Sequence, residues 1–167
     1  MNKLFTHEFK TNVGQFQVAS TEKGLALISF GPKRNQIFDN IVKKHYRGYQ
    51  IVPGGNENKK AEAQIGRYLD GKLKKFSLRL DIEGTAFQKK ALRKIAAIPY
   101  GKTKTYGAVA KSIGHAGAAR ALGTVNAKNR LPIVIPCHRV VATNGLGGYT
   151  GGLKLKKHFL NLEKANY

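Results

Sequence analysis

Short runs of alternating apolar and polar residues occupy the first part of the chain. Residues 15–19 and 25–30 alternate with a period of two and are bounded by glycines, which predicts antiparallel strands. Residues 35–45 and 59–69 instead repeat with helical spacing. A third alternating run, residues 76–80, predicts a strand that leads out of this region. The pattern is typical of a small sheet with two helices.

Helical spacing dominates the second half. Thr85 stands where an N-cap would begin a helix over residues 86–97, and Thr105 does the same for a short helix over residues 106–113. A glycine-containing turn separates the latter from a helix predicted over residues 116–127. Two short helices joined in this way predict a helix-turn-helix.

The pattern changes around residues 81–84, where we expect a domain boundary. The predicted fold class is α/β (α+β), in two domains. Residues 1–80 form a small antiparallel sheet with helices, and residues 84–167 form a mainly helical domain with the helix-turn-helix. A chain of 167 residues that is 41% hydrophobic is long enough to bury one good core or two small ones.

An apolar run near the C-terminus is interrupted by three polar side chains. Residues 132–141 read as a buried strand, yet Cys137, His138 and Arg139 stand in its middle. A free cysteine by itself is more often a small core residue than a nucleophile. Adjacent cationic groups and a nearby base favour the thiolate, so the trio indicates a nucleophilic cysteine.

Positive charge changes the picture further, because the formal net charge is +21. The 30 Lys and Arg residues divide evenly about Asp81, whereas no Asp or Glu occurs between Gly84 and Leu162. This balance favours a nucleic acid as partner, the alternative being a merely solvated basic surface. We place the polyanion-binding face in the second half, where Glu163 is the only acid after Glu83.

The second helix of the predicted helix-turn-helix carries short side chains. Ala118 and Ala119 would let the backbone approach DNA closely, and Arg120 is the one side chain long enough to reach base edges. Such a helix would recognise shape and phosphates more than sequence. Tight packing of this small face inside the protein is the alternative.

The chain has 1 cysteine and 5 histidines. A single thiol excludes an intramolecular disulfide, a CxxC redox pair and a cysteine-based zinc cluster, and the histidines lack the spacing of a metal site. We therefore predict no metal. Since there is neither an apolar run of about 18 residues nor a secretory leader, we expect a soluble protein without membrane contact. Its expected location is the cytoplasm, or the nucleus in a eukaryote.

Pro136-Cys137-His138-Arg139-Val140 is similar to the active-site signature of the O6-alkylguanine-DNA alkyltransferases, the methylated-DNA–protein-cysteine methyltransferases. About half of the chain resembles this family specifically, and the N-terminal half does so only in outline. The further matching segments, in order, are Gly84-Thr85-Ala86-Phe87-Gln88, Ile98-Pro99-Tyr100-Gly101, Thr105-Tyr106, Ala118-Ala119-Arg120, Asn129 and Tyr149-Thr150-Gly151-Gly152-Leu153.

The resemblance implies a Cys–His–Glu arrangement. Cys137 is the implied nucleophile, His138 the base that acts through a water, and Glu163, on a C-terminal helix, the carboxylate that orients the histidine. Tyr106 is implied as a proton donor toward the base of the nucleotide. Asn129 is implied to tie the DNA-binding helix to the active-site turn.

The resemblance also implies a guanine pocket. The main-chain carbonyls of Cys137 and Val140, with Tyr149 and Thr150, would surround the guanine edge. An alkyl group on O6 is out of reach inside a stacked duplex, so the nucleotide has to be extruded.

On the DNA side, the resemblance implies that Arg120 fills the space that the extruded nucleotide leaves. Ala118, Ala119 and Arg139 are grouped with it as binding residues. The implied activity is one irreversible transfer of an alkyl group from O6-alkylguanine in double-stranded DNA to Cys137, by a monomer and without a cofactor. O4-alkylthymine is a further candidate substrate.

Two other functions remain open on the sequence. A lesion-binding protein would flip alkylguanine without reacting, and relatives of that kind lack the cysteine, so Cys137 is the discriminating residue. A cysteine hydrolase using Cys137 and His138 would need an oxyanion site but no large positive charge. The zinc site that some relatives carry in the N-terminal domain is not expected, because no cysteine stands there.

Overall fold

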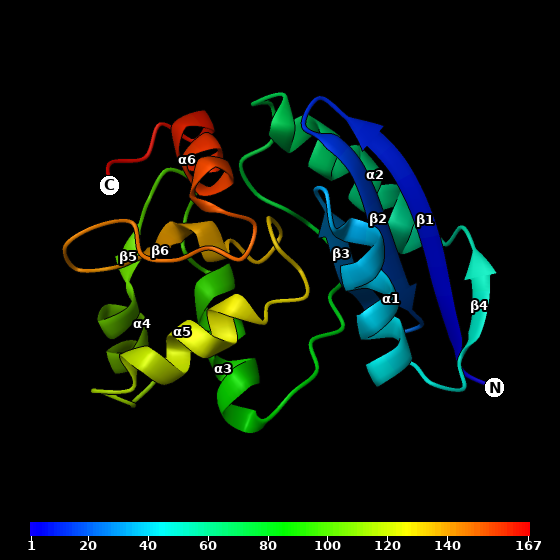
Figure 1. Ribbon diagram of the computed structural model, residues 1–167, viewed down its shortest axis with the longest axis horizontal. Helices are drawn as coiled ribbons and strands as arrows, with labels where there is room; N and C mark the ends of the chain where they lie inside the picture. The colour runs from blue at the N-terminus through cyan, green and yellow to red at the C-terminus, as the bar shows by residue number, and fades with distance from the viewer. The chain divides into compact units, whose positions relative to one another are not determined.

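The structure is a computed structural model that describes residues 1–167. The chain divides into two compact units, Met1–Asp81 and Ile82–Tyr167, whose elements are labelled in Figure 1. None of the helices combines the length and the apolar character that crossing a bilayer requires.

The first unit is built on one four-stranded sheet with the order β3-β2-β1-β4. Its strands are β1 (Lys3–Thr11), β2 (Gly14–Thr21), β3 (Gly24–Phe30) and β4 (Gln50–Pro53). The first three strands are antiparallel neighbours, whereas β4 pairs with β1 in parallel. The sheet is therefore mixed, which corrects the expectation of an antiparallel sheet.

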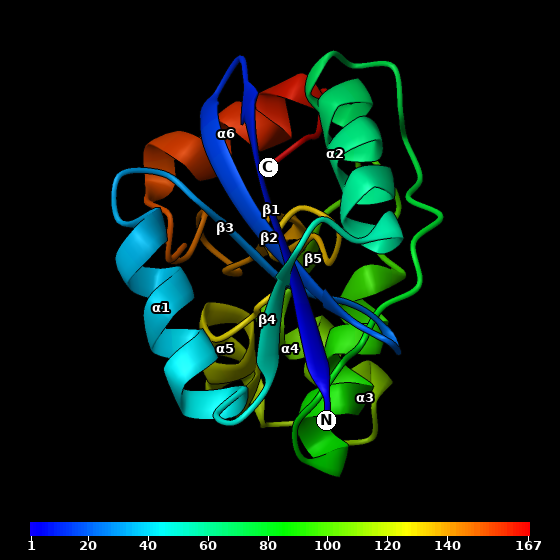
Figure 2. The ribbon, with the colours of Figure 1, turned by 90° about the vertical axis from the view of Figure 1, so that its right-hand side faces the viewer.

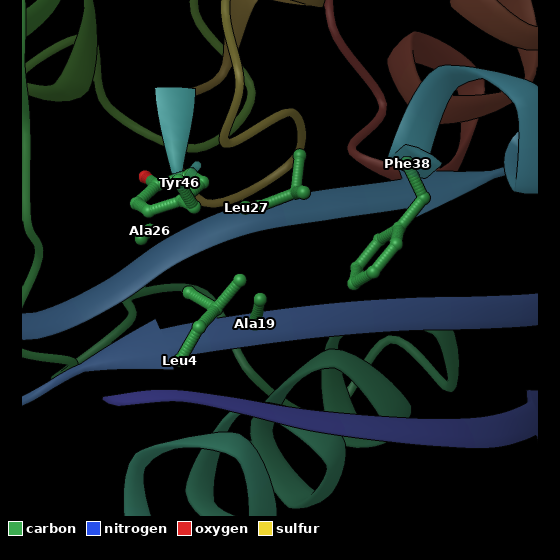
Figure 3. Close-up of a cluster of buried hydrophobic side chains, with 6 residues drawn as sticks. All are labelled: Leu4, Ala19, Ala26, Leu27, Phe38 and Tyr46. Atoms are coloured by element: carbon green, nitrogen blue, oxygen red, sulfur yellow. The ribbon is translucent and has the colours of Figure 1, made fainter. Parts of the chain in front are cut away.

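Helices α1 (Arg34–His45) and α2 (Asn56–Leu69) confirm the two helices predicted in this unit. Figure 2 shows them flanking the sheet. Phe38 of α1 reaches into an apolar cluster on the sheet, shown in Figure 3. The buried members of this cluster are Leu4, Ala19, Ala26, Leu27, Phe38 and Tyr46.

The sequence pattern missed β1 and β4, and the strand predicted over residues 76–80 is wrong. That segment makes only a single parallel bridge, between Leu80 and Leu25 of β3. The amide of Leu25 donates to the Arg79 carbonyl, and the amide of Asp81 donates to the Leu25 carbonyl, each at 2.8 Å. Two bonds hold the segment along the strand edge without making it a strand.

The second unit is mainly helical, as predicted. Its helices are α3 (Ala86–Ala96), α4 (Tyr106–Ser112), α5 (Ala119–Ala127) and α6 (Leu153–Leu162). Two short strands, β5 (Lys104–Thr105) and β6 (Val140–Val141), pair in parallel. This pairing sets the start of α4 beside the chain that follows the cysteine motif.

Local capping explains where these helices begin. Thr85 and Gln88 form a reciprocal capping box at α3, and Thr105 caps α4 by accepting a bond from the Ala108 amide at 3.1 Å. The second helix of the helix-turn-helix begins at Ala119, later than predicted. Gly114 and Gly117 both have positive φ, at 81° and 87°, and a helix cannot run through such residues.

Residues 132–141 do not form the buried strand that their apolar character predicts. The chain turns at Ile133, whose φ is 75°, makes a short 3₁₀ turn over Cys137–Arg139, and becomes extended only in β6. A positive φ is unusual for a β-branched residue and indicates a loop that its surroundings hold in a strained form.

Candidate active site

Asn129 holds the strained loop that precedes the cysteine. Its side-chain amide donates to the Ile135 carbonyl at 2.9 Å, and its side-chain oxygen accepts a bond from the Leu131 amide at 2.9 Å. The bond to Ile135 closes the loop across Ile133, and the bond from Leu131 fixes the start of the loop. Asn129 thus links the chain just after α5 to Ile135, two residues before Cys137.

Asn126 is a second asparagine at the turn, and the sequence analysis missed it. It lies on α5, is 6% exposed, and donates from Nδ2 to the main-chain carbonyl of Cys137 at 3.2 Å. Helical spacing from Leu122 to Val125 and Asn126 places it on the buried face of α5, a signal present in the sequence. Asn126 links the second helix of the helix-turn-helix directly to the cysteine.

His138 and Glu163 form a buried pair. Nε2 of His138 lies 2.8 Å from Oε1 of Glu163, and both side chains are fully buried. Glu163 is the residue that ends α6, and its other oxygen accepts a bond from the Gly101 amide at 3.1 Å. The structure therefore pairs His138 with Glu163 directly after Cys137 in the chain, and the joint action of the three residues stays a prediction.

Arg139 lies inside the protein, where the sequence analysis had grouped it with DNA-binding residues. Its guanidinium donates to Glu163 and, from Nη1, to the Ile98 carbonyl at 2.6 Å. The side chain is only 6% exposed. Because these acceptors occupy the guanidinium, we correct its assignment from a DNA contact to a residue that holds Glu163 in place.

The protonation of the site follows from its burial. Burial raises the pKa of the Cys137 thiol, while the Asn129 side chain, the charge of Lys156 and the Tyr149 side chain lower it. Burial lowers the pKa of His138, and the hydrogen bond and charge of Glu163 oppose that shift. The resting site is therefore a neutral thiol beside a neutral imidazole. With Nε2–H donated to the carboxylate, Nδ1 is the basic nitrogen of the ring.

Tyr106 is the first residue of α4 and lies against the segment that follows β6. Its hydroxyl donates to the Gly148 carbonyl at 3.3 Å. Gly147 has φ of 71°, and a Cβ there would stand 2.9 Å from the Tyr106 ring. Burial raises the pKa of Tyr106, so the hydroxyl keeps its proton near neutral pH.

Of the remaining predicted pocket residues, Tyr149 and Thr150 lie in the segment that follows β6, and Val140 lies in β6 itself. The Thr150 hydroxyl donates to the Ala127 carbonyl of α5 at 2.9 Å, and Tyr149 is half-buried. Val140 is buried, and its carbonyl accepts a bond from Lys156 at 2.7 Å. Lys156 was not among the predicted site residues. Its position three and four residues before Phe159 and Leu160 would have placed it on the buried face of α6.

Ala118, Ala119 and Arg120 lie at the beginning of α5. The two alanines are half-buried and Arg120 is exposed. No hydrogen bond or ion pair joins Arg120 to Cys137, so the structure presents this arginine to solvent rather than to the cysteine.

Fold and site together define a class: a protein with one buried cysteine, backed by a His–Glu pair, in a domain with a helix-turn-helix. The profile described as 6-O-methylguanine DNA methyltransferase, DNA binding domain, matches residues 86–165. The profile described as 6-O-methylguanine DNA methyltransferase, ribonuclease-like domain, matches residues 4–82. The chain belongs to the 6-O-methylguanine-DNA methyltransferase family.

Individual relatives agree over nearly the whole chain. The methylated-DNA–protein-cysteine methyltransferase of Methanosarcina acetivorans is 39% identical over 160 residues, which are 93% of this chain and 95% of the relative. The OGT protein of Mycobacterium tuberculosis, solved in complex with DNA, matches with a TM-score of 0.79 at 32% identity, over 97% of this chain and 92% of that one. The O6-methylguanine-DNA methyltransferase of Pyrococcus kodakaraensis matches with a TM-score of 0.67 at 28% identity, over 96% and 98%.

Proposed function

We propose that this chain is a methylated-DNA–protein-cysteine methyltransferase that repairs DNA by direct reversal, with Cys137 as the acceptor. The sulfur attacks the alkyl carbon on O6 of guanine, a C–S bond forms, and the C–O bond breaks with its electron pair staying on the guanine. The observation that carries the proposal is the buried Cys137 turn backed by His138 and Glu163, in a chain of this family.

In this mechanism the proton of the Cys137 thiol moves to His138. Nδ1 of His138 receives it through a bridging water, and the imidazolium that results is stabilised by the Glu163 carboxylate at 2.8 Å. Because the resting thiol and imidazole are both neutral, the thiolate forms as part of the reaction rather than before it. Asn126 and Asn129 hold the turn so that the sulfur keeps its position.

The guanine leaves with developing negative charge, which a proton donor would stabilise. Tyr106 is suited to this role because its hydroxyl stays protonated and lies beside Gly148, the residue before Tyr149. Val140 of β6, with Tyr149 and Thr150 of the segment that follows it, completes the proposed pocket. We assign the guanine edge to this pocket, as the resemblance implies.

Double-stranded DNA is the partner in this proposal. The relative from Mycobacterium tuberculosis was solved in complex with DNA, and the net charge of +21 here favours a polyanion. Arg120 is exposed at the start of α5 and is free to enter the space that an extruded nucleotide leaves. The protein acts where DNA lies, in the cytoplasm or, in a eukaryote, in the nucleus.

A thioether cannot be displaced by a second thiol as a disulfide can, so each molecule reacts once. This leads to a direct test by mass spectrometry after incubation with excess O6-methylguanine oligonucleotide. We expect the peptide that contains Cys137 to gain the mass of a single CH₂ group, and the reaction to stop at equimolar product. Cys137→Ala should still bind the oligonucleotide without gaining mass. Repeated turnover, or a methyl group on another residue, would refute the proposal.

A further inference from the structure

Lys156 is a fully buried cation at the active site. It lies on α6, its side chain is 0% exposed, and its Nζ donates to the carbonyls of Val140 at 2.7 Å, Leu146 at 2.6 Å and Gly148 at 3.1 Å. An ammonium group has three N–H donors and a neutral amine has two. Three carbonyl acceptors therefore match the protonated form and use every donor that it has.

No carboxylate is among the hydrogen-bond partners of this ammonium. Glu163, the buried acid at the end of α6, is hydrogen-bonded to Arg139 and His138 instead. A buried charge without a counter-charge is costly, and an apolar side chain of similar size would spare that cost. A fold that retains Lys156 here must gain something from its charge or from its three bonds.

The three carbonyls belong to two parts of the active site. Val140 follows the Cys137–Arg139 turn directly, whereas Leu146 and Gly148 lie in the segment that leads to Tyr149. Tyr106 adds to the same junction, because its hydroxyl also donates to Gly148 and its ring centroid lies 5.9 Å from Nζ of Lys156. Lys156 thus fastens the pocket segment to the turn that carries the nucleophile.

The charges of Lys156 and Cys137 also act on each other. The ammonium lowers the pKa of the thiol, and burial lowers the pKa of Lys156 to about 8 while a thiolate at Cys137 raises it. His138 is the other titratable group that feels this charge, which lowers its pKa. A thiolate at Cys137 is thus the counter-charge that the ammonium otherwise lacks.

We propose that Lys156 is a positioning residue for the transfer reaction, which clamps residues 146–148 onto the Cys137 turn and directs a fixed positive charge toward that turn. The proposed effect of Lys156 on alkyl transfer rests on the proposed function. The hold of Lys156 on residues 146–148 and the effect of its charge on the Cys137 thiol do not, and both are tested without DNA.

The first test measures the rate at which iodoacetamide alkylates the thiol as a function of pH. Cys137 is the only cysteine, so the reaction reports on this thiol alone. Lys156→Met should move the midpoint of the profile upward by about one pH unit, because a nearby cation no longer favours the thiolate. Lys157→Met removes the same charge from the exposed neighbouring position and should leave the midpoint unchanged.

The second test measures amide hydrogen exchange in residues 146–149. Loss of the three bonds should speed exchange there by about tenfold or more in Lys156→Met and not in Lys157→Met. The proposal requires both the upward shift of the alkylation midpoint and the faster amide exchange. A midpoint or an exchange rate in Lys156→Met equal to that of Lys157→Met would overturn the proposal.

The third test uses the unaltered chain and so does not depend on how a variant folds. With lysine labelled at the ε carbon, the NMR titration of Lys156 should have a midpoint near about 8 instead of the ordinary 10.5, because the ammonium is buried. A midpoint at the ordinary value would place Lys156 outside the buried junction and would also overturn the proposal. If these results hold while Cys137 takes no methyl group from DNA, the proposed function fails and the clamp stands.

Discussion

The guanidinium of Arg139 holds the carboxylate of Glu163 through three hydrogen bonds, from Nε at 2.9 and 3.2 Å and from Nη2 at 2.8 Å. Both side chains are almost completely buried. The same carboxylate accepts the bond to His138, so Arg139 fixes the acid that orients the base. An arginine beside the cysteine in the sequence therefore acts on the cysteine by way of a residue 24 positions later.

Removing this guanidinium should destabilise the fold. Arg139→Met leaves Glu163 as a buried charge without its strongest partner, which typically costs about 3–5 kcal/mol. We expect a loss of that size in the free energy of unfolding, measured by urea denaturation. Arg120→Met removes an exposed arginine and should change it by less than about 0.5 kcal/mol. Equal effects of the two changes would contradict the buried pair.

Glu163→Gln should slow methyl transfer by about tenfold or more, because the imidazolium of His138 loses its stabilising charge. The sign of the pH effect follows from the shifts at the site. Glu163 raises the pKa of His138, so its loss makes the base weaker and the thiolate harder to form. The pH profile of thiol alkylation should therefore move to higher pH.

The matched control for this change is Glu83→Gln, which alters the net charge equally in the same unit. Glu83 lies 4.0 Å from Arg130, far along the chain from the cysteine. Single-turnover rates should be compared below the unfolding temperature of each variant. A Glu163→Gln rate equal to that of Glu83→Gln would return Glu163 to a purely structural role.

Arg120→Ala should affect duplex repair far more than the reaction with free O6-benzylguanine, which needs no extrusion from a duplex. Extrusion costs a few kcal/mol, so we expect the ratio of the two rates to fall by about 10- to 100-fold. The measurement is made at saturating DNA, where weaker binding no longer limits the rate. Lys128→Ala, which removes an exposed charge at the end of α5, should leave the ratio unchanged. Equal slowing with both substrates would assign Arg120 to the pocket.

Gly147→Ala should impair transfer, whereas Gly145→Ala should not. A Cβ at Gly147 stands 2.9 Å from the Tyr106 ring, at a φ of 71° that costs a non-glycine residue about 1–2 kcal/mol. A Cβ at Gly145 meets nothing within 4 Å. The ring of Tyr106 must shift in the first variant, so transfer from DNA should slow while the second variant keeps the parent rate. Identical single-turnover rates would show that Tyr106 adapts without cost.

Local features of the sequence were sufficient to predict much of the secondary structure of the second unit. The capping threonines Thr85 and Thr105 and the helical spacing behind them predicted α3 and α4, because a cap and a periodic face act within one or two turns of chain. The strands β1 and β4 escaped prediction. The short β4 ends in Pro53 and becomes a strand only because β1 offers it a parallel edge.

By itself the sequence determined the family and the single thiol, because a motif such as Pro136-Cys137-His138-Arg139-Val140 is read along the chain. The tertiary structure decided how the charged groups are shared. Several cations lie near one buried acid. Only the packing of α6 shows that Glu163 bonds to Arg139 and His138, while Lys156 donates to carbonyls alone. The physical reason is distance. Hydrogen bonds and charge act over a few ångströms in space, and folding brings together groups that the sequence holds about 20 residues apart.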